Sequence, residues 1–236
     1  MAMSNDEEMD QIRRRFGKPT LGAAVYMALV SLATNAYLLH LVVNGEASRV
    51  GIALYGVLEL IAYSVIGNIT MAAVPKDLRV GSPDVPLPKR ILAIVVMSAI
   101  LCGVAWFAVH ADTEHLDMLR NARDPFAALA DLNILTPLAL TITLAGCASF
   151  SDWFRWRGSG QPFVSGLALS AAAKFVTAIA APIAAMLASD DIHHDAARAT
   201  LVWCSVYIGI KCGLELFFLY WQYRGMPGKA AASRAQ

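Results

Sequence analysis

Six long apolar runs constrain what this chain can fold into more than any other feature of its sequence. They occupy residues 21–43, 50–74, 91–109, 127–150, 163–188 and 198–222. An α-helix of about 20 apolar residues crosses a hydrocarbon core about 30 Å thick, and each run is close to or above that length. The sequence therefore predicts an all-α, polytopic membrane protein with six transmembrane helices.

Little of the chain remains for a soluble domain. Charged residues make up only 16% of the sequence and hydrophobic residues 57%, whereas soluble domains are about 25% charged. The first run is too long for a signal-peptide core of about 7–15 residues, so it predicts a retained helix. We expect a cytoplasmic N-terminal segment at 1–20, a six-helix transmembrane domain at 21–223 and a short cytoplasmic tail at 224–236.

The basic residues outside the apolar runs predict the orientation in the membrane. Thirteen fall on one side of the six predicted spans and four on the other, and loops rich in Lys and Arg stay in the cytoplasm. Both termini are therefore expected in the cytoplasm, and the membrane is expected to be a bacterial inner membrane. The thirteen are Arg13, Arg14, Arg15, Lys18, Lys76, Arg79, Lys89, Arg90, Arg155, Arg157, Arg224, Lys229 and Arg234, and the four are Arg49, Arg120, Arg123 and Arg198.

Polar side chains within the predicted spans are the strongest candidates for a functional site. A charge at the centre of a lipid-facing helix costs about 2.5–3.5 kcal/mol, and a leucine returns only about 0.3–0.6 kcal/mol. The alanine-rich stretch 171–188 cannot carry an exposed Lys174 into lipid, so these side chains are expected to face each other or a water-filled cavity. The set is Asn35, Glu59, Asp131, Asn133, Lys174, Lys211 and Glu215.

Two interpretations of this polar set remain open. Lys211 and Glu215 are one turn apart on one helix face, so the set can be a static network that only holds helices together. Intramembrane ionisable groups also mark the paths of protons, ions and polar solutes. In that hypothesis Glu59 and Lys211 carry protons and Lys174 contacts an anion.

Small residues form a stripe on the last predicted span. Ser205, Gly209 and Gly213 recur every four residues, a pattern that permits close contact between membrane helices. Lys211 lies on the opposite side of the same helix. We expect the small-residue face to meet another helix, a second copy of the chain or a partner membrane subunit, with the lipid bilayer as the remaining partner.

Histidines and acids alternate in two outer loops, HADTEHLD and SDDIHHDA. Imidazole and carboxylate groups are suitable ligands for zinc and related divalent ions. One hypothesis is therefore an outer-face metal site made by His110, His115, His193 and His194, and the alternative is a pair of solvated loops whose charge changes near neutral pH. No other cofactor is expected.

Three prolines predict where one helix begins and where two helices bend. Asp124 and Pro125 have the residue types of a helix cap and first turn, and they are expected to open the fourth span. Pro137 and Pro182 lie within the fourth and fifth apolar runs, where each is expected to bend its helix.

The motifs of many function classes are missing from this sequence. It contains no glycine-rich phosphate loop, nucleophile elbow or nucleic-acid-binding patch, and its four cysteines form no CxxC pair. An enzyme is therefore the less favoured class, and no nucleic acid is expected as a partner. Three hypotheses remain: a small proton- or ion-linked transporter or channel-like protein, a non-transporting scaffold or subunit, and a metal binder.

Overall fold

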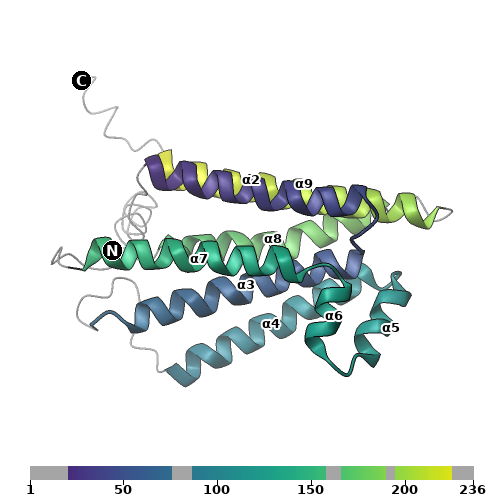
Figure 1. Cartoon of the computed structure of the whole chain (residues 1–236), viewed down its shortest axis with the longest axis horizontal. Helices are drawn as coiled ribbons and strands as arrows, with labels where there is room; N and C mark the ends of the chain where they lie inside the picture. The colour runs from purple at the N-terminus through teal and green to yellow at the C-terminus, as the bar shows by residue number, and fades with distance from the viewer. Residues whose placement is uncertain (1–20, 76–86, 158–165, 190–194, 225–236) are drawn as a thin grey trace, which may run out of the picture.

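A computed structural model describes residues 21–75, 87–157, 166–189 and 195–224 of the chain (Figure 1). The predicted N-terminal segment and nearly all of the predicted tail lie outside these residues. The described part is all-helical, with eight helices and no strand. The helices are α2 (Leu21–Val43), α3 (Arg49–Ala72), α4 (Leu87–Val109), α5 (Thr113–Asn121), α6 (Pro125–Asp131), α7 (Leu135–Trp156), α8 (Gly166–Ser189) and α9 (Ala196–Arg224).

Apolar side chains cover the outside of the bundle as well as its core. The most apolar helix, α4, buries only 11% of its membrane-length window inside the protein. Large contiguous apolar surfaces are unfavourable in water and favourable in lipid, so the apolar helices indicate an integral membrane protein. Exposed large side chains include Leu29, Ile69, Leu92, Phe107, Phe150, Leu187 and Phe217.

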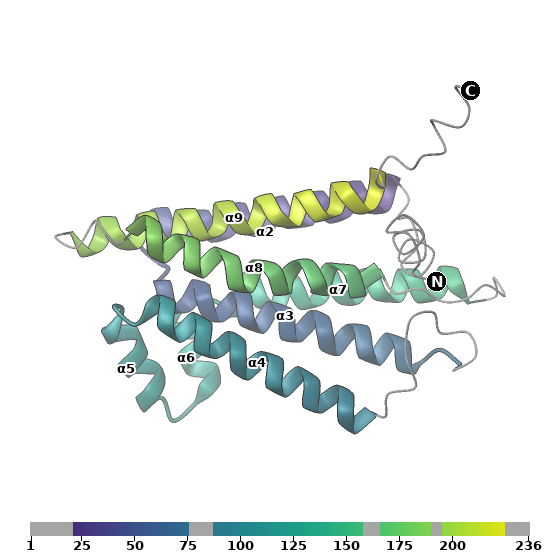
Figure 2. The ribbon, with the colours of Figure 1, turned by 180° about the vertical axis from the view of Figure 1, so that it is seen from behind.

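Helices α3 and α8 lie at the centre of the bundle. Helix α3 packs against α4, α7 and α8, and α8 packs against α9 and α4 as well. Helices α2 and α9 lie side by side and form a layer along one face, which both views of the ribbon show (Figures 1 and 2). We call this pair the α2–α9 layer. A polar group on the inner side of α9 therefore faces α8 and α3.

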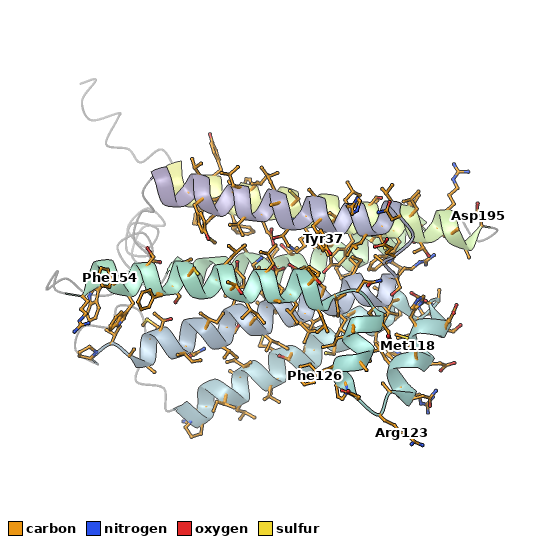
Figure 3. The ribbon with its side chains drawn as sticks, in the orientation of Figure 1. Tyr37, Met118, Arg123, Phe126, Phe154 and Asp195 are labelled. Carbon is orange, nitrogen blue, oxygen red and sulfur yellow. The ribbon has the colours of Figure 1, made fainter. Side chains whose placement is uncertain are left out.

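The two ends of the bundle differ. The start of α2 and the end of α9 lie at the same end (Figures 1 and 2), which is the arrangement expected if both termini are on one side of a membrane. Helices α5 and α6 form a hairpin at the other end, where Met118, Arg123 and Phe126 lie, while Phe154 lies at the far end of α7 (Figure 3). Which end faces the cytoplasm stays a prediction from the loop charges.

The predicted fourth span is not one continuous helix. The sequence predicts a single helix over 127–150, but the structure places α6 and α7 on either side of a break, with an angle of 105° between them. Asp124 caps α6 by accepting a hydrogen bond from the N–H of Phe126, and Pro125 occupies the first turn. The cap and first-turn proline are thus as predicted, but they open a helix of only 7 residues.

The break has a local cause that the hydropathy of the segment does not reveal. Asn133 adopts a left-handed backbone with φ 56°, and Asn is one of the few residues that tolerates this conformation. The N–H groups of Asn133 and Ile134 then bond the carbonyls of Ala130 and Leu129, the pattern of a helix stop. Pro137, which has no N–H for the carbonyl four residues earlier, falls in the first turn of α7, where it is tolerated.

The described part of the chain supports four or five of the six predicted spans. In the described part of the chain, α2, α3, α4 and α9 are long and apolar enough to cross a membrane, and α6 with α7 makes a fifth span if the bent pair counts as one. The described apolar stretch of α8 covers only Ala173–Ser189, which includes Pro182. Six spans remain a prediction.

Candidate functional site

Two lysines and two glutamates from three helices meet inside the bundle. Lys174 Nζ of α8 lies 2.6 Å from Glu59 Oε1 of α3 and 2.7 Å from Glu215 Oε1 of α9. Lys211 Nζ of α9 lies 3.1 Å from Glu59 Oε2 and 2.7 Å from Glu215 Oε1. The four side chains alternate in sign and close a ring with no net charge, which we call the charge ring.

Burial explains why the four groups come together. Glu59 is 4% exposed, Lys174 8% and Lys211 1%. Removing an ionised group from water costs several kcal/mol unless an opposite charge and hydrogen bonds compensate it. Every member of the ring touches two opposite charges, so the buried Lys/Glu cluster expected from the cost of charges in lipid is present in the structure.

Glu215 is the more heavily hydrogen-bonded carboxylate of the two. Its Oε1 accepts from both lysines, and its Oε2 accepts from Ser31 Oγ at 2.6 Å and Asn35 Nδ2 at 3.3 Å. Because Asn35 also donates to the backbone oxygen of Ser31 at 2.8 Å, its amide is held in place. Glu215 therefore connects α9 to both α8 and α2.

Glu59 has a different set of donors. Besides the two lysines it accepts a hydrogen bond from the hydroxyl of Tyr55 at 3.2 Å, and that hydroxyl is 2.8 Å from Thr141 Oγ1 of α7. Two aromatic faces also border the ring: Lys174 Nζ is 4.5 Å from the centroid of Tyr63, and Lys211 Nζ is 5.6 Å from that of Tyr55. Such contacts stabilise ammonium groups that have left water.

The polar set predicted from the sequence does not include several of these partners of the charge ring. Tyr55 and Tyr63 lie four residues before and after Glu59, so helical periodicity places all three on one face of α3. Ser31 lies four residues before Asn35, so the same periodicity places these two residues on one face of α2. These spacings were a usable signal, whereas nothing in the sequence joins Thr141 to the site, because only the packing of α7 against α3 brings it there.

A cavity of about 50 Å³ touches all four members of the charge ring. A water molecule needs roughly 10–15 Å³ of such volume, so the cavity has room for about three. It has both polar and apolar walls and lies between the α2–α9 layer and the rest of the bundle. The lining residues are Met27, Val30, Ser31, Thr34, Glu59, Tyr63, Thr141, Ala173, Lys174, Lys211, Glu215, Phe218 and Leu219.

The cavity lies in one half of the bundle. Its lining from α9 begins at Lys211 and runs toward the end of that helix, near the start of α2. In the other half, Trp203 and Tyr207 stack with their centroids 5.3 Å apart and are at most 1% exposed. Tyr207 also fills the space beside Gly56. Aromatic packing therefore closes the ring on the side of the α5–α6 hairpin.

Two of the predicted polar residues lie elsewhere. Asp131 ends α6 and Asn133 lies in the break before α7, and both side chains are exposed. Asn133 donates to the backbone oxygen of Glu46 at 2.8 Å, so it ties the helix break to the loop between α2 and α3. The structure brings Asn35 to the charge ring but neither of these two, because the break ends the helix that was expected to carry them inward.

The small-residue face of α9 is uncovered in the described part of the chain. Gly209 and Gly213 are exposed, and a Cβ at either position would meet no atom within 4 Å. Ser205 is half-buried. No described helix packs closely on the two glycines, so the expected contact with a second copy or a partner subunit stays a prediction.

The predicted outer metal site is only partly described. His110 Nδ1 is 2.7 Å from the backbone oxygen of Phe107, and His115 Nδ1 is 2.7 Å from Asp112 Oδ1. His193 and His194 lie outside the described residues. The residues that are described contain no group of three or more His, Cys, Asp or Glu side chains placed to hold a metal ion, and metal binding by the four histidines stays a prediction.

Comparison with known proteins finds no relative of this chain. No protein-family model matches the chain, and neither a curated protein nor a solved structure shows a significant match to it. The charge ring and its cavity therefore have to be interpreted from their own chemistry.

Proposed function

We propose that this chain is a small transporter or channel-like protein of a bacterial inner membrane, with both termini in the cytoplasm, that moves a proton, ion or small polar solute through the charge ring. One observation carries the proposal: the cavity of about 50 Å³ borders all four charged side chains. A network that only holds helices together has no need of open space beside it, whereas a pathway requires space large enough for water or an ion.

The connections of the ring support this function. Its four ion pairs link α3, α8 and α9, and Glu215 also accepts from Ser31 on α2. A proton or ligand that displaces one ion pair therefore changes how the α2–α9 layer is held to α3 and α8. Trp203 and Tyr207 stack in the half of the bundle that the cavity does not reach, and we expect access to the charge ring from the other half.

Flux in proteoliposomes tests this function. We expect the wild-type protein to carry protons down a pH gradient, followed with an entrapped pH-sensitive dye, and the double variant Lys211→Ala, Glu59→Gln to fall to the leak of protein-free vesicles. The matched control removes one cation and one carboxylate outside the ring, Arg123→Ala with Asp131→Asn, both of which are exposed, and it should keep the wild-type rate. Equal rates in wild type and the ring variant would remove the support for transport.

A non-transporting scaffold or subunit is the second candidate. Two observations favour it: every charge in the ring is already paired twice, and the Gly209 face of α9 is uncovered. In this case, neutralising the ring lowers the yield of folded protein without changing flux, because the ring only holds the helices.

The oligomeric state separates the two candidates further. If the Gly209 face binds a second copy or a partner, Gly209→Leu should shift the complex to a smaller species on native gels, because the leucine fills the contact. The same change should leave the fold of the single chain intact, since Gly209 is exposed and a Cβ at this position meets no neighbour within 4 Å. Migration identical to that of wild type would argue against an interface on this face.

A further inference from the structure

Three of the four members of the charge ring can form further hydrogen bonds. An ammonium group has three N–H donors. Lys174 donates to both carboxylates, whereas Lys211 donates to Glu215 and forms an ion pair with Glu59. Glu215 accepts from four donors, whereas the one contact given for Oε2 of Glu59 in the described part of the chain is the ion pair with Lys211. The groups with spare capacity are therefore Glu59 and the two lysines, and all three line the cavity.

The neutrality of the ring limits what can bind beside it. A single ion of either sign would bring an uncompensated charge into a buried space, which is costly. One proton added to Glu59 changes this situation, because the ring then carries one positive charge and both ion pairs of Glu59 weaken. Lys174 and Lys211 each gain a donor that no longer points to a carboxylate.

We propose that protonation of Glu59 turns the cavity into a binding site for one small monovalent anion, held by the ammonium groups of Lys174 and Lys211. The inference rests on the proposed function, because it names what that pathway takes. The proton comes from water and forms an O–H bond on the Glu59 carboxylate, and the anion binds as an ion. Proton and anion enter and leave together, so no net charge accumulates in the site.

Glu59 rather than Glu215 takes the proton because hydrogen bonds to the ionised form of a carboxylate preserve that form. Ser31 and Asn35 donate to Glu215 in addition to both lysines, and every one of these donors would lose an ionised acceptor. Glu59 would lose only the two lysines and Tyr55.

In the part of the chain that the structure describes, the titratable groups near Glu59 are mostly tyrosines and the other members of the charge ring. Helix α4 has no charged residue between Ile91 and Val109, and the polar cavity residues of α2 and α7 are hydroxyl-bearing side chains that do not titrate in this range. The titratable groups near Glu59 are Tyr55 and Tyr63 on its own helix, Lys174 on α8, and Tyr207, Lys211 and Glu215 on α9. No acid other than Glu215 is among them.

The size and lining of the cavity limit the anion. About 50 Å³ accommodates an ion the size of a few waters at most. Met27, Val30 and Phe218 give the cavity apolar walls, which disfavour a strongly hydrated divalent anion. Chloride and nitrate fit both limits and serve as probes.

Calorimetry of the purified whole protein with sodium chloride and sodium nitrate across a pH series tests the inference. Because one proton binds with one anion, linkage predicts that Kd tightens by about tenfold for each pH unit of acidification, over the range in which proton uptake accompanies anion binding. Glu59→Gln fixes the neutral form, so it should bind the anion with no such pH dependence. Lys174→Met should not bind it, and the exposed control Asp131→Asn should behave as wild type.

A measurement on the wild-type protein alone covers the case in which a variant does not fold. Adding chloride at constant acidic pH should increase the infrared band of a protonated carboxyl group, because anion binding draws a proton onto Glu59. Absence of binding by both probes at every pH, binding without pH dependence, or no change in the carboxyl band would each overturn the anion site.

The outcomes distinguish this inference from the proposed function. Anion binding with the expected pH dependence, together with no flux in proteoliposomes, would keep the anion site and remove transport. Proton flux that depends on the charge ring, together with no anion binding, would keep transport and remove the anion site.

Discussion

Replacing Glu215 with glutamine should lower the free energy of unfolding by about 3–5 kcal/mol, the range for removing one partner of a buried ion pair. The change leaves Lys174 and Lys211 sharing the single carboxylate of Glu59, and it deprives Ser31 and Asn35 of an ionised acceptor. Unfolding of the detergent-solubilised protein in a denaturant series measures the loss.

Two companion variants make this prediction specific to charge. Lys211→Met added to Glu215→Gln restores the neutrality of the ring, so the double variant should be more stable than the sum of the two single losses. Glu59→Gln should cost less than Glu215→Gln, because Glu59 has fewer donors. If both glutamate variants lose the same free energy and the double variant shows no coupling, the ring does not act as one electrostatic unit.

Gly56→Ala should destabilise the bundle by about 1–3 kcal/mol, the usual cost of overpacking a filled core. A Cβ at Gly56 would collide with the hydroxyl of Tyr207, and Tyr207 cannot move easily because it is 1% exposed and stacks on Trp203. The same denaturant series measures the effect.

Removing the colliding atom should rescue the variant. Tyr207→Phe deletes the hydroxyl that the new methyl group meets first, so adding it to Gly56→Ala should recover most of the loss. The matched control is Gly209→Ala on α9, where a Cβ meets no atom within 4 Å and where alanine is a better helix former than glycine by about 1 kcal/mol. A Gly56→Ala protein as stable as this control would show that the close contact between α3 and α9 does not form.

Much of the fold follows from hydropathy. The first predicted span, 21–43, has the same bounds as α2, and the second and third, 50–74 and 91–109, differ from α3 and α4 by only a few residues at their ends. Long apolar runs locate helices well because each residue contributes to the same transfer free energy, and errors at single positions average out.

The fourth predicted span shows where hydropathy summed along a run fails to predict the helix. Averaged over a window, residues 127–150 form one apolar run, yet the chain turns through 105° between α6 and α7. One residue with a positive φ, Asn133, decides the outcome. A backbone geometry of this kind depends on a few torsion angles, which a window of summed side-chain energies does not contain.

The sequence likewise predicted one part of the candidate site, and the packing of the helices decided the rest. The cost of burying charge showed that Glu59, Lys174, Lys211 and Glu215 belong inside the bundle, and helical spacing paired Lys211 with Glu215. The alternating ring, its contacts with Ser31 and Thr141, and the cavity beside it come from how α2, α7, α8 and α9 pack. Asp131 has the same residue chemistry and lies outside, because the break before α7 leaves it at the end of the bundle.

By itself the sequence determined that this chain is helical and apolar enough for a membrane, and that its interior charges need partners. Those properties depend on residue type and on spacing along one helix, both of which can be read from a single segment. The tertiary structure decided which charges meet, which carboxylate is the better hydrogen-bonded, and where space for water remains. These depend on distances between helices that are far apart in the chain, and small differences in packing determine them.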